Sequence, residues 1–229
     1  MAVDKNKEEK ATVVENLDSH LTKAGQKVAN NKKIIYICAG VIGIVAAFVL
    51  SYLFIYRNPR LQNSWEAFNK VYLMQQKGEF ASDSITAEEY QKVSVNFSGT
   101  PAGNVAALAA AEAFFDVKNY DKAIELLKKI DLSEPVLEAQ AQALLGDAYT
   151  HKDKWDDALA SYDKAIKIAD GNPQLVPAYL IKKANVYDLQ GKYGEALACY
   201  EEIKTNYPTY NYGEGIDFYI ENEKAKAGK

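Results

Sequence analysis

The sequence contains few of the residues from which metal, haem and disulfide sites are built. Its 229 residues include two cysteines and two histidines, too few for a zinc, haem or iron–sulfur site. Cys38 lies inside a long apolar segment and Cys199 far outside it, so we expect no disulfide between them. Basic residues do not dominate either, with 27 Lys+Arg against 31 Asp+Glu. We therefore expect no metal, no cofactor and no nucleic-acid partner.

Groups of catalytic residues are missing as well. The acidic pairs Asp156-Asp157 and Glu88-Glu89 are adjacent in sequence, and neighbours on a helix point about 100° apart, so neither forms an acid/base pair. We expect neither His20 nor His151 to form part of a catalytic triad, and no glycine-rich phosphate loop is present. We predict a protein that is not an enzyme and has no catalytic residues.

Charge is absent from one long stretch of the chain. The 23 residues from Ile34 to Tyr56 carry none, and about 20 apolar residues suffice to span a bilayer core. A cleavable signal peptide has a shorter apolar core of about 7–15 residues. We therefore interpret 34–56 as an uncleaved transmembrane helix in the lipid bilayer.

The flanks of this segment predict its orientation. Seven lysines precede it, whereas only Arg57, Arg60 and Lys70 occur in the 20 residues after it. Because cytoplasmic flanks are enriched in Lys and Arg, we expect a cytoplasmic N-terminus and an external C-terminal domain. Residues 1–33 also have apolar side chains at helical spacing, from Val14 to Val28, which predicts an amphipathic tail; a short coiled coil is the alternative.

Small residues recur every four positions inside the apolar segment, at Ala39, Gly43, Ala47 and Ser51. Such a stripe allows close approach of another helix, so these four residues are a candidate transmembrane helix contact. The alternative is that small residues are simply frequent in membrane helices.

A repeated pattern occupies the second half of the chain. Three alanines each follow an aromatic residue by three positions and precede a large side chain by four: Ala123 before Leu127, Ala158 before Tyr162, and Ala196 before Tyr200. The alanines are 35 and 38 residues apart, close to the roughly 34-residue tetratricopeptide (TPR) repeat. Small residues let two helices approach, and aromatic residues fill the space between neighbouring repeats. We predict an all-α fold, a single N-terminal transmembrane helix followed by a TPR α-solenoid with capping helices.

The predicted parts follow one another along the chain. They are a cytoplasmic amphipathic tail (1–33), the transmembrane helix (34–56), membrane-proximal helices that form an N-terminal cap (57–99), three degenerate TPR repeats (100–211) and a C-terminal capping helix (212–229). Within the N-terminal cap, Thr86 and Glu89 have the spacing of a capping box, which predicts that a helix begins there.

The first helix of each TPR repeat lines a concave surface. The residues that we expect to face this groove are Glu112, Asp147 and Asn185, with Phe115, Thr150 and Asp188 one turn further on. They predict an acidic, partly apolar groove for a polypeptide of basic or mixed character. The alternative is a solvated polar face with no ligand.

The arrangement of tail, anchor and TPR domain resembles the YfgM-like family, an ancillary subunit of the bacterial Sec translocon. The stretch from Phe97 to Asn104, FSGTPAGN, is similar to the family's entry into its first repeat, and the segment from Tyr193 to Pro208 is similar to its ending. The resemblance implies a bacterial inner-membrane protein with a periplasmic domain. Its implied partners are Sec translocon subunits, a membrane-anchored isomerase-like chaperone and translocating polypeptides. The alternative is a TPR scaffold subunit of another envelope complex, in cell-wall or outer-membrane assembly.

Overall fold

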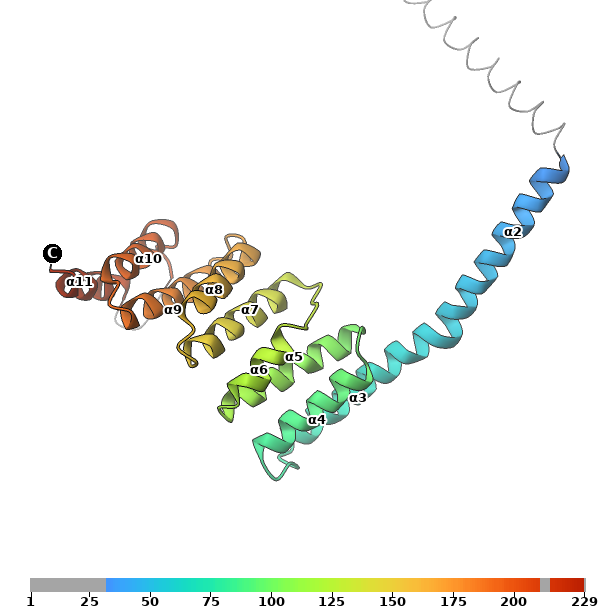
Figure 1. Cartoon of the computed structure of the whole chain (residues 1–229), viewed down its shortest axis with the longest axis horizontal. Helices are drawn as coiled ribbons and strands as arrows, with labels where there is room; N and C mark the ends of the chain where they lie inside the picture. Colours follow the sequence, from blue (N-terminus) through green and yellow to red (C-terminus); the bar gives the residue numbers. More distant parts are fainter. Residues whose placement is uncertain (1–31, 211–214, 229) are drawn as a thin grey trace, which may run out of the picture. The chain divides into compact units, whose positions relative to one another are not determined.

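The computed structural model describes residues 32–210 and 215–228, and the regular elements in these ranges are helices (Figure 1). The apolar seam from Val14 to Val28, most of the predicted tail and the predicted boundary between residues 211 and 212 lie outside the described residues. The chain divides into two compact units, one ending at Pro59 and one beginning at Arg60.

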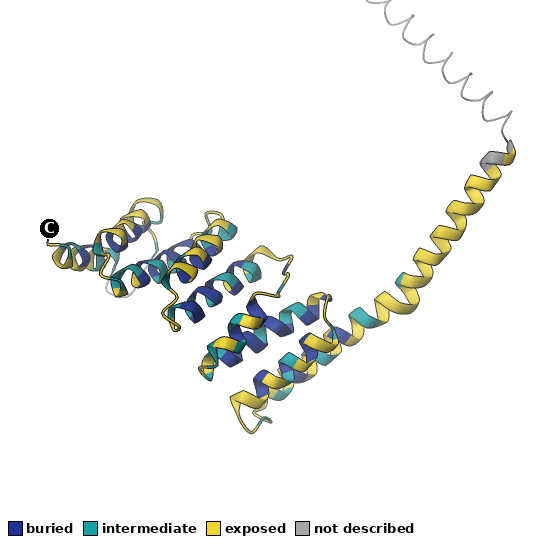
Figure 2. Cartoon of the chain, in the orientation of Figure 1, coloured by how far each residue is buried: buried dark blue, intermediate teal, exposed yellow. Residues whose placement is uncertain are grey.

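The first unit is an apolar helix with exposed side chains (Figure 2). It contains α2 (Lys32–Ser51) and a π-helical segment, η1 (Tyr52–Arg57), which leads into α3 (Asn58–Gln76). Large apolar side chains are open to the surroundings, with Phe48 74% and Ile55 77% exposed. Water disfavours so much exposed apolar surface, whereas lipid accommodates it. Among the described residues, the helical run Tyr36–Gln76 is long and apolar enough to cross a membrane, which makes it a candidate membrane span.

The second unit is a series of antiparallel helix pairs. After the last part of α3, its helices are α4 (Asp83–Asn96), α5 (Pro101–Asp116), α6 (Tyr120–Leu127), α7 (Pro135–Thr150), α8 (Trp155–Ala169), α9 (Leu175–Leu189), α10 (Tyr193–Asn206) and α11 (Ile216–Lys226). Successive helices pack against each other along the series. The prediction of an all-α fold is thus confirmed.

Side-chain caps define where several helices begin. The Thr100 hydroxyl accepts a hydrogen bond from the Gly103 amide at 3.0 Å, and Pro101 occupies the first turn of α5. The Glu134 carboxylate accepts from the Leu137 amide at 2.9 Å in the same way at the start of α7. Each cap satisfies an amide that has no partner within its helix.

The capping box predicted at Thr86 is wrong. The structure begins α4 at Asp83, and the Ser82 side chain accepts from the Ile85 amide. Thr86 is buried and donates its hydroxyl hydrogen bond to the Ser82 carbonyl. Ser82 and Thr86 both have side chains that can cap a helix. Because Thr86 is buried against the core as part of the helix, Ser82 takes the capping position.

The turn inside each TPR repeat has the same backbone geometry. Lys118, Asp153 and Gly191 occupy equivalent places and have φ angles of 61°, 55° and 71°. The residue after each of them donates its amide to a carbonyl five residues earlier, which closes the end of the first helix. Glycine adopts this left-handed conformation freely, whereas Lys118 and Asp153 adopt it at a cost that the surrounding packing offsets.

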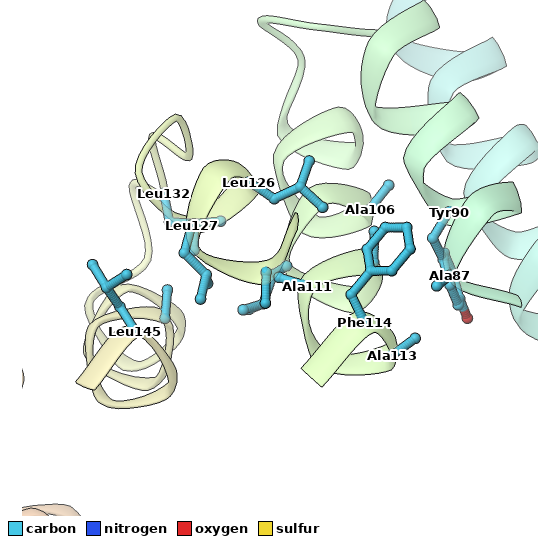
Figure 3. Close-up of a cluster of buried hydrophobic side chains, with 14 of the residues drawn as sticks. Ala87, Tyr90, Ala106, Ala111, Ala113, Phe114, Leu126, Leu127, Leu132 and Leu145 are labelled. Atoms are coloured by element: carbon cyan, nitrogen blue, oxygen red, sulfur yellow. The ribbon is translucent and has the colours of Figure 1, made fainter. Parts of the chain in front are cut away.

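The core lies between the paired helices (Figure 3). The three repeat alanines, Ala123, Ala158 and Ala196, are completely buried. Gly146 in α7 shows why small residues are needed there, since an added Cβ would lie 2.6 Å from Cε1 of Tyr162. Close approach of the two helices thus depends on the missing side chain at this position.

Candidate functional site

The predicted groove residues lie on the first helices of the three repeats. Four of them, Phe115, Asp147, Thr150 and Asn185, line one pocket of about 300 Å³. Three residues that were not predicted complete its lining: His151, Tyr162 and Lys182. The pocket thus gathers side chains from α5, α7, α8 and α9. Its role as a binding site stays a prediction.

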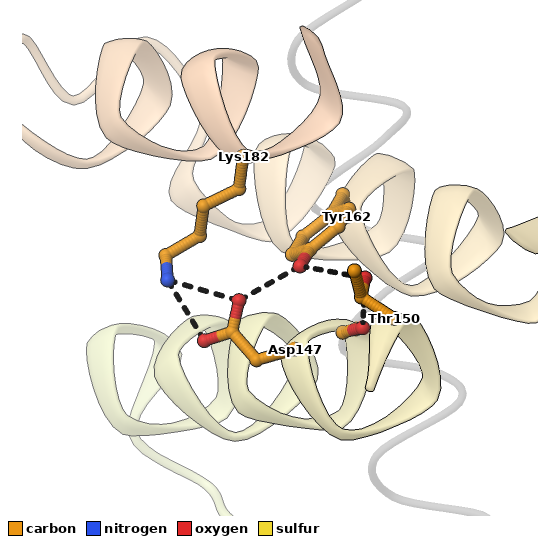
Figure 4. A network of polar contacts seen from close by, with 5 residues as sticks. Asp147, Thr150, Tyr162 and Lys182 are labelled. Atoms are coloured by element: carbon orange, nitrogen blue, oxygen red, sulfur yellow. Dashed lines mark hydrogen bonds and ion pairs between the residues drawn. The ribbon is translucent and has the colours of Figure 1, made fainter. Parts of the chain in front are cut away.

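Asp147 is the centre of the polar network in this pocket (Figure 4). Lys182 Nζ donates to both carboxylate oxygens of Asp147, at 2.9 and 2.8 Å. The Tyr162 hydroxyl donates to Oδ1 of Asp147 at 2.7 Å and lies 3.4 Å from Oγ1 of Thr150. Desolvation, followed by the charge of Asp147, raises the pKa of Tyr162 far above its ordinary value. Tyr162 therefore remains a protonated donor that holds the carboxylate in place.

The contact between Tyr162 and Asp147 recurs in other helix pairs. Tyr200 donates to Oδ1 of Asn185 at 3.4 Å, again between residues 15 positions apart. The same separation relates Tyr90 of α4 to Gln75 of α3, where the hydroxyl donates to Oε1 at 2.7 Å. The pair α3–α4, which was predicted as a cap, thus repeats a side-chain contact of the TPR repeats.

The first repeat departs from this pattern. Its residues at the corresponding positions are Glu112 and Leu127, and leucine cannot donate a hydrogen bond. Glu112 instead lines a different pocket, of about 310 Å³, with residues of α3, α4, α5 and α7. Desolvation, followed by the nearby charge of Asp116, raises the pKa of Glu112.

Lysines neutralise part of the acidity that the sequence predicts for the groove. Lys182 pairs with Asp147, and Lys226 of α11 lies 2.7 Å from Asp188 and 2.9 Å from Glu223. Asp188 is therefore held by the C-terminal helix and does not line either of the pockets described above. Sequence patterns did not identify Lys182, because its partner lies 35 residues earlier.

An aromatic cluster borders the pocket at the turn of the second repeat. The rings of Tyr120 and His151 stack with centroids 4.6 Å apart, and Phe115 meets both rings edge-on at 5.3 and 5.4 Å. This cluster links the first and second repeats through their turn residues. It also gives the pocket an apolar wall beside its polar network.

The candidate transmembrane helix contact lies in the first unit. Ala39, Gly43, Ala47 and Ser51 are all exposed in the first unit, and their role as a helix contact stays a prediction.

Cys199 is buried, and desolvation raises the pKa of its thiol to about 11. A thiol of this kind stays protonated at neutral pH and is a poor nucleophile.

The repeat region matches a known protein family. A family model described as tetratricopeptide repeat matches residues 137–208, which run from α7 through α10. The chain is a TPR repeat protein. The match covers the second and third predicted repeats. TPR folds are scaffolds that typically mediate protein–protein interactions. No curated protein matches the chain.

Solved structures share the fold of the TPR domain. The crystal structure of MamA protein has 21% identity and a TM-score of 0.53, with 74% of this chain and 83% of that chain covered. TPR-like repeats of a Podosopora anserina protein described as a kinesin light chain have 15% identity and a TM-score of 0.55, with 74% and 87% covered. At such identities the likeness concerns the fold alone.

Proposed function

We propose that the chain is a membrane-anchored TPR adaptor that binds polypeptides through the first helices of its repeats. The observation that supports this most is the pocket around Asp147, to which helices from three repeats contribute. It offers a fixed carboxylate, a lysine and an aromatic wall, which together suit main-chain and mixed side-chain groups of a polypeptide.

The site of action that we propose is the periplasmic exit of the Sec translocon. The 23-residue apolar segment and the lysines before it favour an inner-membrane protein with a cytoplasmic N-terminus and a periplasmic TPR domain. The resemblance to YfgM-like proteins supports translocon subunits, a membrane-anchored isomerase-like chaperone and translocating polypeptides as partners. The small-residue stripe from Ala39 to Ser51 is the proposed contact with a partner's transmembrane helix.

Tethering explains how weak contacts can serve such a function. A domain held at the membrane meets emerging segments at a high effective concentration, so modest affinity suffices for repeated binding. Binding of this kind needs no bond-making step and no cofactor.

Affinity purification of the full chain from membranes in mild detergent tests the site of action. We expect translocon subunits to co-purify, and a Gly43→Leu/Ala47→Leu variant to recover less of them because the stripe no longer permits close approach. A matched Val41→Leu/Val45→Leu variant changes the same helix away from the stripe and should recover the parental amount. Stable recovery of a cell-wall or outer-membrane assembly complex in place of the translocon would contradict the proposal.

A further inference from the structure

Two pockets of the TPR domain form one groove along α3, α5 and α7. One, of about 310 Å³, is lined by Phe68, Tyr72 and Glu112, and the other, of about 260 Å³, by Trp65. Both are also lined by Val105 and Leu137 and are therefore side by side. This groove, which we call the α3 groove, is distinct from the pocket around Asp147.

Aromatic rings form one wall of the α3 groove. Trp65, Phe68 and Tyr72 are spaced along one face of α3, and their rings contact in sequence, with centroids 6.0 and 6.4 Å apart. Tyr90 of α4 adds a fourth ring, 5.7 Å from Phe68. Trp65 is nevertheless 42% exposed and Tyr72 46% exposed. Large aromatic side chains that remain accessible beside a hollow are typical of surfaces that bind other proteins.

Acidic residues line both pockets of the groove: Asp131 and Glu134 line the Trp65 pocket, and a closely spaced pair lines the Tyr72 pocket. Glu112 and Asp116 lie one turn apart on α5, and both line the same pocket as Tyr72. No ion pair within residues 32–210 and 215–228 involves either carboxylate, and no lysine or arginine lines either pocket. The mutual repulsion of the two carboxylates contributes to the raised pKa of Glu112. A cation placed between them would relieve this repulsion.

The combination of an aromatic face and paired carboxylates selects the chemistry of the ligand. A guanidinium group can stack on a tyrosine ring and donate to a carboxylate in the same plane, which an ammonium group does less well. Apolar side chains complement the rest of the wall, from Phe68 to Trp65. The charge and shape of the α3 groove thus both favour a basic, apolar polypeptide segment.

We propose that the α3 groove binds an apolar polypeptide segment and receives one of its arginine side chains between Tyr72, Glu112 and Asp116. The inference rests on the proposed function, since it specifies the ligand class for one part of the surface made by the first helices. It adds α3, which precedes the predicted repeats, to the binding surface.

Binding of two labelled peptides to the full chain in lipid nanodiscs tests this inference. The peptides share leucine- and valine-rich flanks and differ only at a central residue, which is arginine in one and the neutral isostere citrulline in the other. We expect the arginine peptide to bind about ten-fold more tightly, as for one charge-assisted hydrogen-bonded pair. Glu112→Gln/Asp116→Asn should bring the two affinities within about two-fold by weakening only the arginine peptide. The matched variant Glu201→Gln/Glu202→Gln, on the exposed side of α10, should keep the preference.

The outcomes separate this inference from the proposed function. If the parent chain binds both peptides equally, polypeptide binding stands and the arginine pocket is wrong. If Glu112→Gln/Asp116→Asn keeps the parental preference, arginine is recognised elsewhere and the inference is likewise overturned. If the parent chain binds neither peptide, both the inference and the proposed function are contradicted.

Discussion

The hydroxyl of Tyr162 donates a 2.7 Å hydrogen bond to Oδ1 of Asp147, across the two helices of one repeat. The ring of Tyr162 is buried, while the carboxylate of Asp147 faces a pocket on the surface. One side chain therefore connects the core of the repeat to its candidate binding surface. The packing that stabilises α7 against α8 also orients the group that a ligand would meet.

Replacing Tyr162 by phenylalanine tests the contribution of this hydrogen bond. We expect Tyr162→Phe to lower the free energy of unfolding by about 1 kcal/mol, because the ring packing remains while the hydrogen bond is lost. Chemical denaturation of the full chain in detergent, followed by circular dichroism, measures the change. Tyr72→Phe, which removes a hydroxyl from an exposed side chain, should leave stability within about 0.5 kcal/mol of the parent. Equal stability of all three proteins would show that the bond contributes nothing.

Gly146 provides a second test of the helix packing. An alanine Cβ at this position would lie 2.6 Å from Cε1 of Tyr162, so we expect Gly146→Ala to lower the free energy of unfolding by about 1–3 kcal/mol. Gly194→Ala is the matched control, because an added Cβ there meets nothing within 4 Å. Since alanine favours helix over glycine, that variant should be as stable as the parent or more stable. An unchanged unfolding midpoint for Gly146→Ala would contradict the close approach of α7 and α8.

The raised pKa of Glu112 predicts a pH-dependent effect on stability. Because desolvation and Asp116 raise the folded-state pKa above its ordinary 4.5, the stability associated with the protonated group is lost as pH rises through the folded pKa. We therefore expect Glu112→Gln to raise the melting temperature at neutral pH. The difference from the parent should vanish at pH values below the ordinary pKa, where the glutamate is protonated in both states.

The control for this effect is Glu125, a glutamate whose pKa is lowered. A hydrogen bond from Lys129 lowers the pKa of Glu125, so Glu125→Gln should give no gain in melting temperature at neutral pH. A gain of the same size in both variants would indicate a general effect of net charge and not of the Glu112 site.

The orientation of the chain in the membrane can be measured with fused reporters. A phosphatase that requires export for activity should be active when it is fused after Lys229, because the lysines before Ile34 favour a cytoplasmic N-terminus. A reporter that is active only in the cytoplasm should be inactive at the same position. The reverse pattern would place the TPR domain in the cytoplasm and contradict the proposed site of action.

The sequence predicted the repeats because their packing has a regular period. Ala158 and Tyr162 lie in one buried cluster, and Ala196 and Tyr200 lie in another one repeat later, so the pattern is visible in a single sequence. Local signals were less reliable. The left-handed turn residue is a glycine only at Gly191, and nothing in the propensities of Lys118 or Asp153 predicts their positive φ angles.

The candidate site was only partly predictable. Positions on the first helices identified Asp147 and Asn185, because they depend on the repeat register alone. The partner Lys182 depends on a contact between different repeats, which no local pattern encodes. The aromatic residues of α3 have helical spacing in the sequence, but their place beside Glu112 of α5 depends on how the two helices are arranged. We predicted an acidic groove without the lysine partners of Asp147 and Asp188, which are Lys182 and Lys226. Charges that are paired across repeats change what the surface can bind.

Site-specific photocrosslinking in whole cells tests the central claim most directly. A photoreactive amino acid at Asn185, in the pocket around Asp147, should crosslink to newly exported polypeptides. The same amino acid at Lys164, an exposed residue of α8 that lines none of the pockets described above, should give little or no such product. Equal yields from the two positions, or no exported polypeptide from either, would contradict polypeptide binding by the first helices of the TPR domain.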